Sequence, residues 1–189
     1  MIVDKSKNIN ETMVFFSTFL KNPKEVSALI PTPKFLIDKL LEEIDFENAK
    51  YIAEYGAGTG CISAELLKRA GKDAKILCFE LNRTLFKYLK ETLNDDRLKI
   101  IGDSAEKAAE YAVNYEIPYF DYVISTLPFT HLEPDTKTKI LVETKKILSN
   151  KGKFIFYKLF PLYERNLRKI FSRTSMKFAS PCLVYVCGK

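Results

Sequence analysis

The segment EYGAGTG, residues 54–60, places three glycines at alternate positions directly after a short apolar run. A strand that turns through glycines into a helix leaves unpaired backbone N–H groups, with no side-chain bulk, at the end of the strand. The sequence therefore predicts that Gly56, Gly58 and Gly60 form a binding site for a nucleotide-like cofactor.

Two acidic residues near this segment narrow the choice of cofactor. Glu54 stands two positions before the first glycine, and Glu80 ends the next apolar run, 26 residues after Glu54. A carboxylate at the end of this second run can accept both hydroxyls of a ribose. The dinucleotide fingerprint G-x-G-x-x-G would need a further glycine at position 61, where this chain has Cys61. The sequence therefore does not match the fingerprint of NAD-binding proteins.

The pattern resembles that of the class I S-adenosylmethionine (SAM) dependent methyltransferases, from Ala53 onward. The resemblance implies that the glycines approach the carboxypropyl end of SAM, that Glu54 orients its amino group and that Glu80 binds its ribose. The residues expected to bind the cofactor are Glu54, Gly56, Gly58, Gly60, Glu80, Leu81, Asp103, Ser104 and Ser125.

The turn Gly102-Asp103-Ser104 follows a third apolar run and resembles the adenine-binding turn of this family. The resemblance implies that Asp103 accepts a hydrogen bond from the exocyclic amine of adenine. Asp is also a preferred residue at helix N-termini, and a helix is expected to follow. Binding and capping therefore both stay open for Asp103.

The segment STLPF, residues 125–129, follows another apolar run, where class I enzymes bind the methyl acceptor. N6-adenine methyltransferases, including those that dimethylate ribosomal RNA, have Asn-Leu/Ile-Pro-Phe/Tyr here, with the aromatic ring stacked on the flipped base. Leu127, Pro128 and Phe129 match, but Thr126 replaces the Asn. A threonine hydroxyl can accept only one hydrogen bond from the target amine, and more weakly than an asparagine amide does. RNA is therefore kept as the alternative acceptor.

The N-terminal region extends the comparison to a second group of enzymes. FLKNP at residues 19–23 and VSALIPT at residues 26–32 resemble the F-L-x-x-P and V-G-A-x-x-P-S segments of bacterial phospholipid N-methyltransferases. Their Ser-Gly-Leu-Pro motif resembles residues 125–128, with Thr126 in place of the glycine. The resemblance implies methyl transfer to the amine of phosphatidylethanolamine-type phospholipids. Another small-molecule amine, or a SAM-binding module without activity, are further alternatives.

Methyl transfer to an amine needs a neutral nucleophile in line with the sulfonium, and proximity supplies most of the acceleration. We expect Thr126 and His131, the only histidine, to be the catalytic candidates, with His131 accepting a proton. A solvent-exposed loop histidine is the alternative. Tyr157 and Phe129 are candidates to line the acceptor pocket, or else are aromatic core residues.

Apolar runs and helical periodicity alternate along the chain and must position these residues. Strands are expected at residues 51–55, 75–80, 98–101, 119–125 and 153–158, helices at 61–70, 82–93, 104–115, 134–148 and about 162–171, and a hairpin at 176–187. This alternation predicts a doubly wound α/β sheet, Rossmann-like, mostly parallel with one antiparallel strand near the C-terminus. The methyltransferase resemblance implies the strand order 3-2-1-4-5-7-6.

The 189 residues are expected to form a single SAM-dependent methyltransferase domain, with residues 1–48 as an N-terminal helical extension covering the site. Within this extension, the apolar residues at 13–20 predict a helix that packs on the domain or lies on a membrane. Thr32, followed by Pro33, is expected to cap a second helix.

Charge is unevenly distributed along the chain. Residues 132–189 contain 13 Lys/Arg and 4 Asp/Glu, whereas residues 1–131 contain 17 and 20. This asymmetry favours a face that meets anionic phospholipid or nucleic acid, with a solvated basic helix as the alternative. We expect peripheral contact with an anionic membrane.

Targeting signals and cysteines indicate the compartment. The sequence has no recognisable signal peptide or membrane-spanning run, which favours a cytoplasmic protein, peripheral on the inner membrane face. The four cysteines contain no C-x-x-C pair and are expected to be buried reduced thiols, and no metal is expected.

Overall fold

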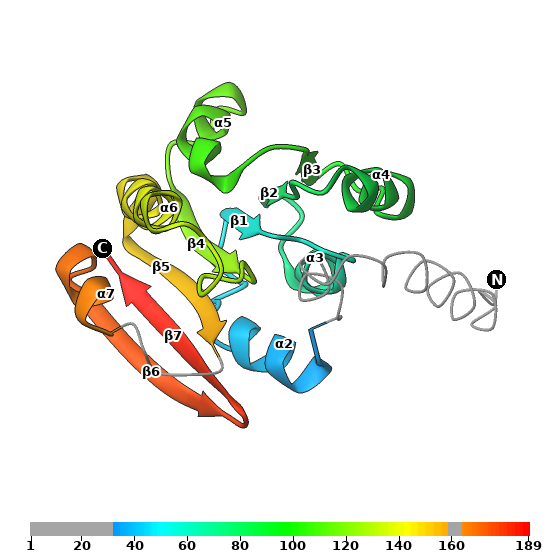
Figure 1. The fold of residues 1–189 in the computed structure, drawn as a ribbon. Coiled ribbons are helices and arrows are strands. Elements are labelled where there is room, and N and C mark those ends of the chain that lie inside the picture. Colours follow the sequence, from blue (N-terminus) through cyan, green and yellow to red (C-terminus); the bar gives the residue numbers. More distant parts are fainter. Residues whose placement is uncertain (1–31, 159–163) are drawn as a thin grey trace.

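The computed structural model describes residues 32–158 and 164–189, and its centre is a seven-stranded sheet (Figure 1). The strands are β1 (Tyr51–Tyr55), β2 (Lys75–Phe79), β3 (Leu98–Ile101), β4 (Phe120–Ser125), β5 (Leu148–Lys158), β6 (Arg173–Ala179) and β7 (Cys182–Gly188). Their order is β3-β2-β1-β4-β5-β7-β6, and β7 runs antiparallel to both of its neighbours. The predicted doubly wound sheet and its strand order are therefore confirmed.

Helices cover both faces of this sheet (Figure 1). They are α2 (Lys34–Leu41), α3 (Cys61–Arg69), α4 (Arg83–Thr92), α5 (Ala108–Asn114), α6 (Pro134–Ile147) and α7 (Glu164–Ile170), with a 3₁₀ turn, η2 (Ala105–Lys107), before α5. One hydrophobic core lies under α2, α3 and α4, and a second lies under η2, α5, α6 and α7. Successive strand residues point to opposite faces, so Ile52 enters the first core and Ala53 the second.

β5 begins at Leu148, five residues before the strand expected at residues 153–158. Leu148 pairs with Phe120 and Lys153 pairs with Tyr122, so the strand is continuous but contains an irregularity of register. The backbone of Gly152 lies close to that of Phe120 in β4, since a Cβ added to Gly152 would be 2.9 Å from the carbonyl oxygen of Phe120. Residues 149–152 therefore form a bulge inside a longer strand.

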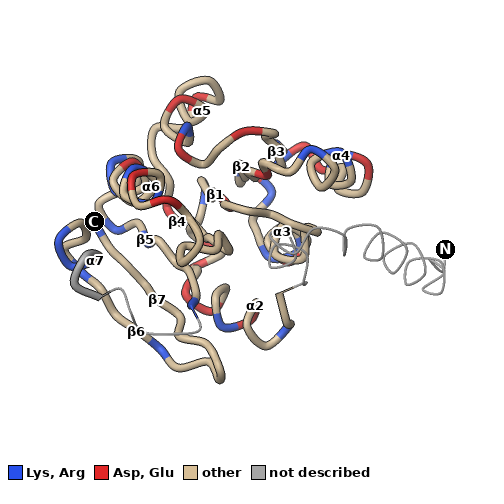
Figure 2. Tube along the Cα trace, viewed as in Figure 1, with Lys and Arg blue, Asp and Glu red and all other residues tan. Residues whose placement is uncertain are grey.

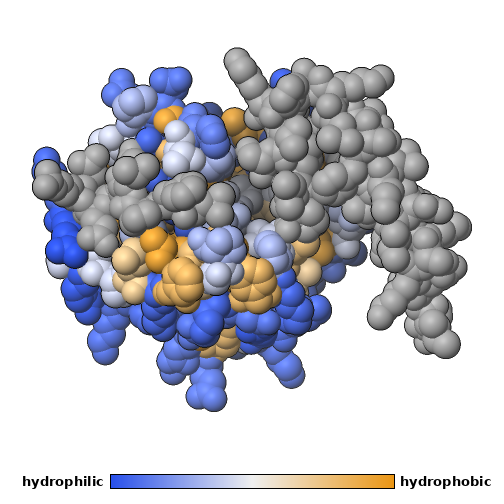
Figure 3. All heavy atoms as spheres, turned by 60° about the horizontal axis from the view of Figure 1, so that its bottom comes forward, coloured by the Kyte–Doolittle hydropathy of each residue, from blue (hydrophilic) through white to orange (hydrophobic). Residues whose placement is uncertain are grey.

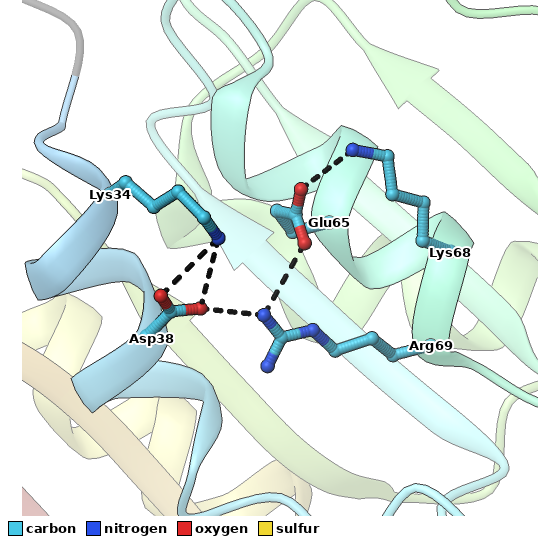
Figure 4. A network of polar contacts seen from close by, with 5 residues as sticks. All are labelled: Lys34, Asp38, Glu65, Lys68 and Arg69. Atoms are coloured by element: carbon cyan, nitrogen blue, oxygen red, sulfur yellow. Dashed lines mark hydrogen bonds and ion pairs between the residues drawn. The ribbon is translucent and has the colours of Figure 1, made fainter.

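An exposed ion-pair network links α2 to α3 (Figure 4). Asp38 accepts hydrogen bonds from Lys34 at 3.3 Å and from Arg69 at 2.6 Å, and Arg69 also reaches Glu65 at 3.3 Å. Thr32, just before α2, does not cap the helix as expected, because no side chain caps it. The Thr32 side chain is instead hydrogen-bonded to Tyr157 near the end of β5.

Much of the positive charge of the C-terminal third lies at one end of the sheet, although Lys158 and Lys177 are at the other end. Lys145 and Lys146 lie in the last turn of α6, Lys169 lies in the last turn of α7, and Arg173 begins β6. Figure 2 shows these basic segments beside the C-terminus. The helices run against the parallel strands, so this basic end is at the amino ends of the parallel strands.

Cysteine burial agrees with expectation for Cys78, Cys182 and Cys187, whereas Cys61 is partly exposed. Within the described ranges, no helix is long and apolar enough to cross a membrane. The expected helix at residues 13–20 and the motifs at residues 19–31 lie outside the described residues.

Candidate functional site

The glycine turn between β1 and α3 has the backbone geometry that only glycine adopts readily. The φ angles of Gly56, Gly58 and Gly60 are 77°, 57° and 81°, all in the left-handed region where a Cβ is strained. The turn rests on the end of β2, because the N–H groups of Gly56 and Ala57 donate to the carbonyl oxygen of Phe79 at 2.9 and 3.1 Å. Strand, turn and helix are thus arranged as the sequence predicted.

Glu80 follows β2 and faces the glycine turn. Its Oε2 accepts from the N–H of Gly58 and its Oε1 from the N–H of Asn82, both at 2.8 Å. Burial raises the pKa of this carboxyl, and hydrogen bonds from the backbone N–H groups of Asn82, Gly58 and Leu81 oppose the shift. Each carboxylate oxygen has a second lone pair, so Glu80 can accept two further hydrogen bonds from a pair of hydroxyls.

Glu54 is buried beneath the same turn. Its Oε2 accepts from the Ser63 hydroxyl at 2.6 Å, and the Cys78 thiol lies 3.5 Å from this oxygen. Burial raises the pKa of Glu54 to about 7, while the hydrogen bonds from Ser63 and Cys78 lower it. Its Oε1 is buried and accepts no hydrogen bond from the described residues, which leaves one strong acceptor available to a ligand.

Ser63 and Cys78 were not predicted as site residues. Ser63 is a polar residue on the buried face of α3, and this mismatch with the apolar periodicity was the one signal available. Cys78 looked like an ordinary core thiol because it lies inside an apolar strand. Together they hold the carboxyl of Glu54 in place.

Asp103 and Ser104 follow β3 with different roles. Ser104 caps η2 by accepting from the N–H of Glu106 at 3.3 Å. Asp103 accepts from the N–H of Ser104 at 2.7 Å, from Lys107 at 2.9 Å and from the Tyr111 hydroxyl at 3.0 Å. These bonds, led by the one from Lys107, lower the pKa of Asp103. The N-cap in this turn is therefore Ser104, and Asp103 is held as a charged carboxylate.

The segment after β4 approaches the glycine turn from the other side. The Thr126 hydroxyl donates to the carbonyl oxygen of Gly56 at 2.5 Å, and the N–H of Leu127 donates to the Ser125 hydroxyl at 3.2 Å. Phe129 is buried, with its ring 5.3 Å from that of Phe156. The ring that would stack on an adenine base is thus part of the core.

A cavity of about 350 Å³ opens where these segments meet. The predicted residues in its lining are Glu54, Gly56, Gly58, Glu80, Leu81, Asp103, Ser104, Thr126 and Tyr157. Other lining residues include Thr32, Cys61, Glu106, Leu127, Pro128, Leu132, Thr136 and Ile140. Four predicted residues are not in its lining: Gly60 packs against Leu89, Ser125 and Phe129 are buried, and His131 is exposed.

The lining is divided by charge. All four of its carboxylates, Glu54, Glu80, Asp103 and Glu106, belong to β1 or to segments that follow β2 and β3. On the side of α2, β4 and β5, the polar groups are the hydroxyls of Thr32, Thr126 and Tyr157. Thr32 ends the motif at residues 26–32 but was expected to cap a helix and not to line the cavity, and the α6 residues Thr136 and Ile140 belong to no recognisable motif.

The carboxylate side of this cavity fits SAM. The unpartnered Glu54 Oε1 suits an ammonium group, the lone pairs of Glu80 suit two ribose hydroxyls, and the glycine turn leaves room for the chain between them. Across the described residues, no group of three or more His, Cys, Asp or Glu is placed to hold a metal ion.

Comparison with known proteins agrees with this geometry. The family model described as the methyltransferase small domain matches residues 32–180. An ornithine lipid N-methyltransferase from Singulisphaera acidiphila is 23% identical over 185 residues, which are 95% of this chain and 96% of that protein. A probable ribosomal RNA small subunit methyltransferase A from Pyrococcus abyssi is 30% identical over 114 residues, which are 60% of this chain but 38% of that protein.

Solved structures are similar in fold. A 16S ribosomal RNA N2 G1207 methyltransferase from T. thermophilus, in complex with AdoMet and guanosine, has a TM-score of 0.64 and 20% identity. The match covers 84% of this chain and 43% of that one. The chain thus spans nearly all of the ornithine lipid enzyme and less than half of both ribosomal RNA enzymes.

Proposed function

This chain belongs to the methyltransferase small domain family and is a SAM-dependent methyltransferase, and on that premise we propose that it methylates the primary amine of a membrane lipid. The lipid would be of the phosphatidylethanolamine or ornithine lipid type. The observation that carries the proposal is the uncharged acceptor side of the cavity, where hydroxyls and aliphatic groups lie and Phe129 is withdrawn into the core. The end-to-end similarity to an ornithine lipid enzyme supports it.

SAM supplies an electrophilic methyl group on a sulfonium. We propose that Glu54, Glu80 and Asp103 bind its amino group, ribose and adenine, so that the methyl group faces Thr126. Leu81 and Ser104, which also line the cavity, would flank the ribose and the adenine. Because SAM is held on the carboxylate side, the uncharged side is left for the acceptor.

Thr126 is suited to orient the acceptor amine. Its hydroxyl hydrogen is donated to the carbonyl oxygen of Gly56, so the oxygen presents only lone pairs to a ligand. It would accept an N–H of the amine and direct the nitrogen lone pair toward the methyl group, which is the in-line geometry that gives most of the rate. A side of the cavity without carboxylates favours the neutral amine, which is the nucleophilic form. His131 is exposed, and would accept only a proton that has already left the cavity.

Replacing Glu80 with glutamine is expected to weaken SAM binding about ten- to hundredfold, because hydrogen bonds to a charged group contribute about 1.5–3 kcal/mol. The NH₂ group of the glutamine would also lie opposite the N–H of Gly58 or of Asn82, and two donors cannot form a hydrogen bond with each other. Calorimetric titration with SAM measures the effect, and Glu91→Gln, an exposed change in α4, is the matched control. Equal affinities in the two variants would remove Glu80 from the cofactor site.

The acceptor is tested with labelled SAM in three parallel reactions, offering vesicles with phosphatidylethanolamine, vesicles with ornithine lipid, and unmodified ribosomal RNA. We expect label in one or both lipids. Thr126→Val should reduce kcat/KM for the lipid about tenfold, the effect of losing one hydrogen bond of about 1.4 kcal/mol, and Thr126→Ser should restore most of it. Label in RNA alone would refute the lipid acceptor.

RNA adenine is the second candidate acceptor. Leu127-Pro128-Phe129 matches the adenine motif, and the similarity to ribosomal RNA methyltransferases supports this alternative. Stacking a base on Phe129 would require its ring to leave the contacts with Phe154 and Phe156.

A further inference from the structure

We propose that four exposed apolar side chains at the cavity end of the sheet, Phe35, Leu81, Met176 and Phe178, form an apolar rim that docks the enzyme onto a lipid bilayer. The inference rests on the proposed lipid acceptor, whose head group must enter the cavity while its acyl chains stay in the membrane. It identifies the surface through which that substrate is reached.

The members of the apolar rim are large and accessible. Their exposed fractions are 48% for Phe35, 70% for Leu81, 43% for Met176 and 72% for Phe178. Single exposed apolar residues are normal on a protein surface and need no explanation. What distinguishes these four is their common position relative to the cavity.

Chain topology places each member at the carboxyl end of the parallel strands. Leu81 comes two residues after β2 and itself lines the cavity. Phe35 is in the first turn of α2, three residues after the cavity-lining Thr32. These two members therefore lie next to the cavity lining.

The register of the last three strands places the other two members. Phe178 pairs with Leu183, which pairs with Lys158, so Phe178 is level with the residue that follows the cavity-lining Tyr157. Met176 is two residues earlier, on the same face of β6 as Phe178. In Figure 3, where the α2 and β6–β7 side of Figure 1 comes forward, a band of apolar surface crosses the middle of the face.

The opposite end of the sheet has a different character. The other two exposed large apolar residues of the described chain, Val113 near the end of α5 and Tyr119 just before β4, are at that end. The basic residues at the ends of α6 and α7 are also there. From Lys151 to Tyr157, six residues of strand span roughly 20 Å. A flat bilayer against the basic end would leave the cavity about that far from the lipid head groups.

Charge near the rim points to the chemistry of the bilayer. Lys34 is paired with Asp38, and Lys177 is paired with Glu43. Each of these lysines is therefore paired with a carboxylate, which leaves little net charge beside Phe35 and Phe178. Docking is thus expected to depend on insertion into the interface and to weaken little with salt, unlike the attraction of free basic residues to anionic lipid.

The chain contains no tryptophan, so a single introduced tryptophan reports on one position. We expect the fluorescence of Phe178→Trp to shift to shorter wavelength when phosphatidylcholine vesicles containing phosphatidylethanolamine are added. Val113→Trp, at a site that is 76% exposed at the opposite end, should not shift. A shift at position 113 alone, or at neither position, would overturn the proposal.

A second measurement separates docking from catalysis. Phe35→Ser with Phe178→Ser should lower vesicle co-sedimentation on the order of tenfold or more, because two apolar side chains no longer insert, and Val113→Ser should not. The double variant should methylate a water-soluble, short-chain phosphatidylethanolamine at the wild-type rate but vesicle lipid more slowly. Equal rates for wild type and double variant on vesicles would refute the rim.

Other outcomes distinguish the two proposals. If wild-type protein methylates neither the short-chain lipid nor vesicle lipid, the proposed lipid acceptor is refuted, independently of the result of the vesicle-binding measurement. If the double variant converts a dimer to a monomer in analytical ultracentrifugation while vesicle binding is unchanged, the rim is an interface between two copies of the chain, and bilayer docking is refuted.

Discussion

Replacing Gly60 with alanine is expected to lower the free energy of unfolding by about 2–5 kcal/mol. At a φ of 81°, an added Cβ strains the backbone by about 1–2 kcal/mol. The Cβ would also lie 2.7 Å from Leu89 Cδ2 and 3.0 Å from Leu93 Cδ1. Leu89 is fully buried, and forcing extra volume into a packed core typically costs about 1–3 kcal/mol. Urea unfolding followed by circular dichroism measures the change.

The same substitution at Gly71 is the matched control. A Cβ on Gly71 would meet no atom within 4 Å, and its φ is not in the left-handed region. We expect Gly71→Ala to leave stability unchanged or to raise it by about 0.4–1 kcal/mol, since alanine restricts the unfolded chain. A loss at Gly60 no larger than the change at Gly71 would show that the glycine turn and the leucines of α4 can relax.

As the pH rises from 4.5 to 7, ionisation of Glu54 alone is expected to lower the free energy of unfolding of the cofactor-free protein by about 3 kcal/mol. Burial raises its pKa from 4.5 to about 7 in the folded chain, so the folded state holds a proton that the unfolded state has lost. The contribution is therefore complete below pH 4.5 and disappears as the pH rises through 7. Urea unfolding at a series of pH values measures this slope.

The variant Glu54→Gln isolates the effect, because other carboxyl groups also titrate in this range. The difference between wild type and Glu54→Gln should change by about 3 kcal/mol from pH 4.5 to 7. Glu91→Gln, on the exposed surface of α4, should follow the wild-type slope. A constant difference between wild type and Glu54→Gln across this range would mean that the Glu54 carboxyl titrates normally.

Local patterns in the sequence were enough to predict the class of fold and which residues meet at one end of the sheet. Apolar runs of strand length alternate with helical periodicity, and such a chain has few topologies besides a doubly wound sheet. Gly56, Gly58, Glu54 and Glu80 could be placed because each directly ends or follows a strand, and the carboxyl ends of neighbouring parallel strands meet at one edge. Chain position alone therefore brings these groups together.

The direction of individual side chains was decided only by the tertiary structure. Phe129 belongs to a motif that suggests base stacking, yet its ring packs on Phe154 and Phe156, because the end of β4 turns it into the core. His131 is three residues after Pro128, a cavity-lining residue, yet it is exposed. Spacing in the sequence does not determine on which side of a loop a residue points.

Contacts between distant segments also depended on the fold. Thr32 meets Tyr157 because α2 packs its buried face on the first core, and the apolar rim collects residues from α2, β6 and the end of β2. The sequence by itself determined that the C-terminal third is basic. Only the structure decided that much of this charge lies at the amino ends of the parallel strands, away from the cavity, because α6 and α7 run antiparallel to those strands and have lysines in their last turns.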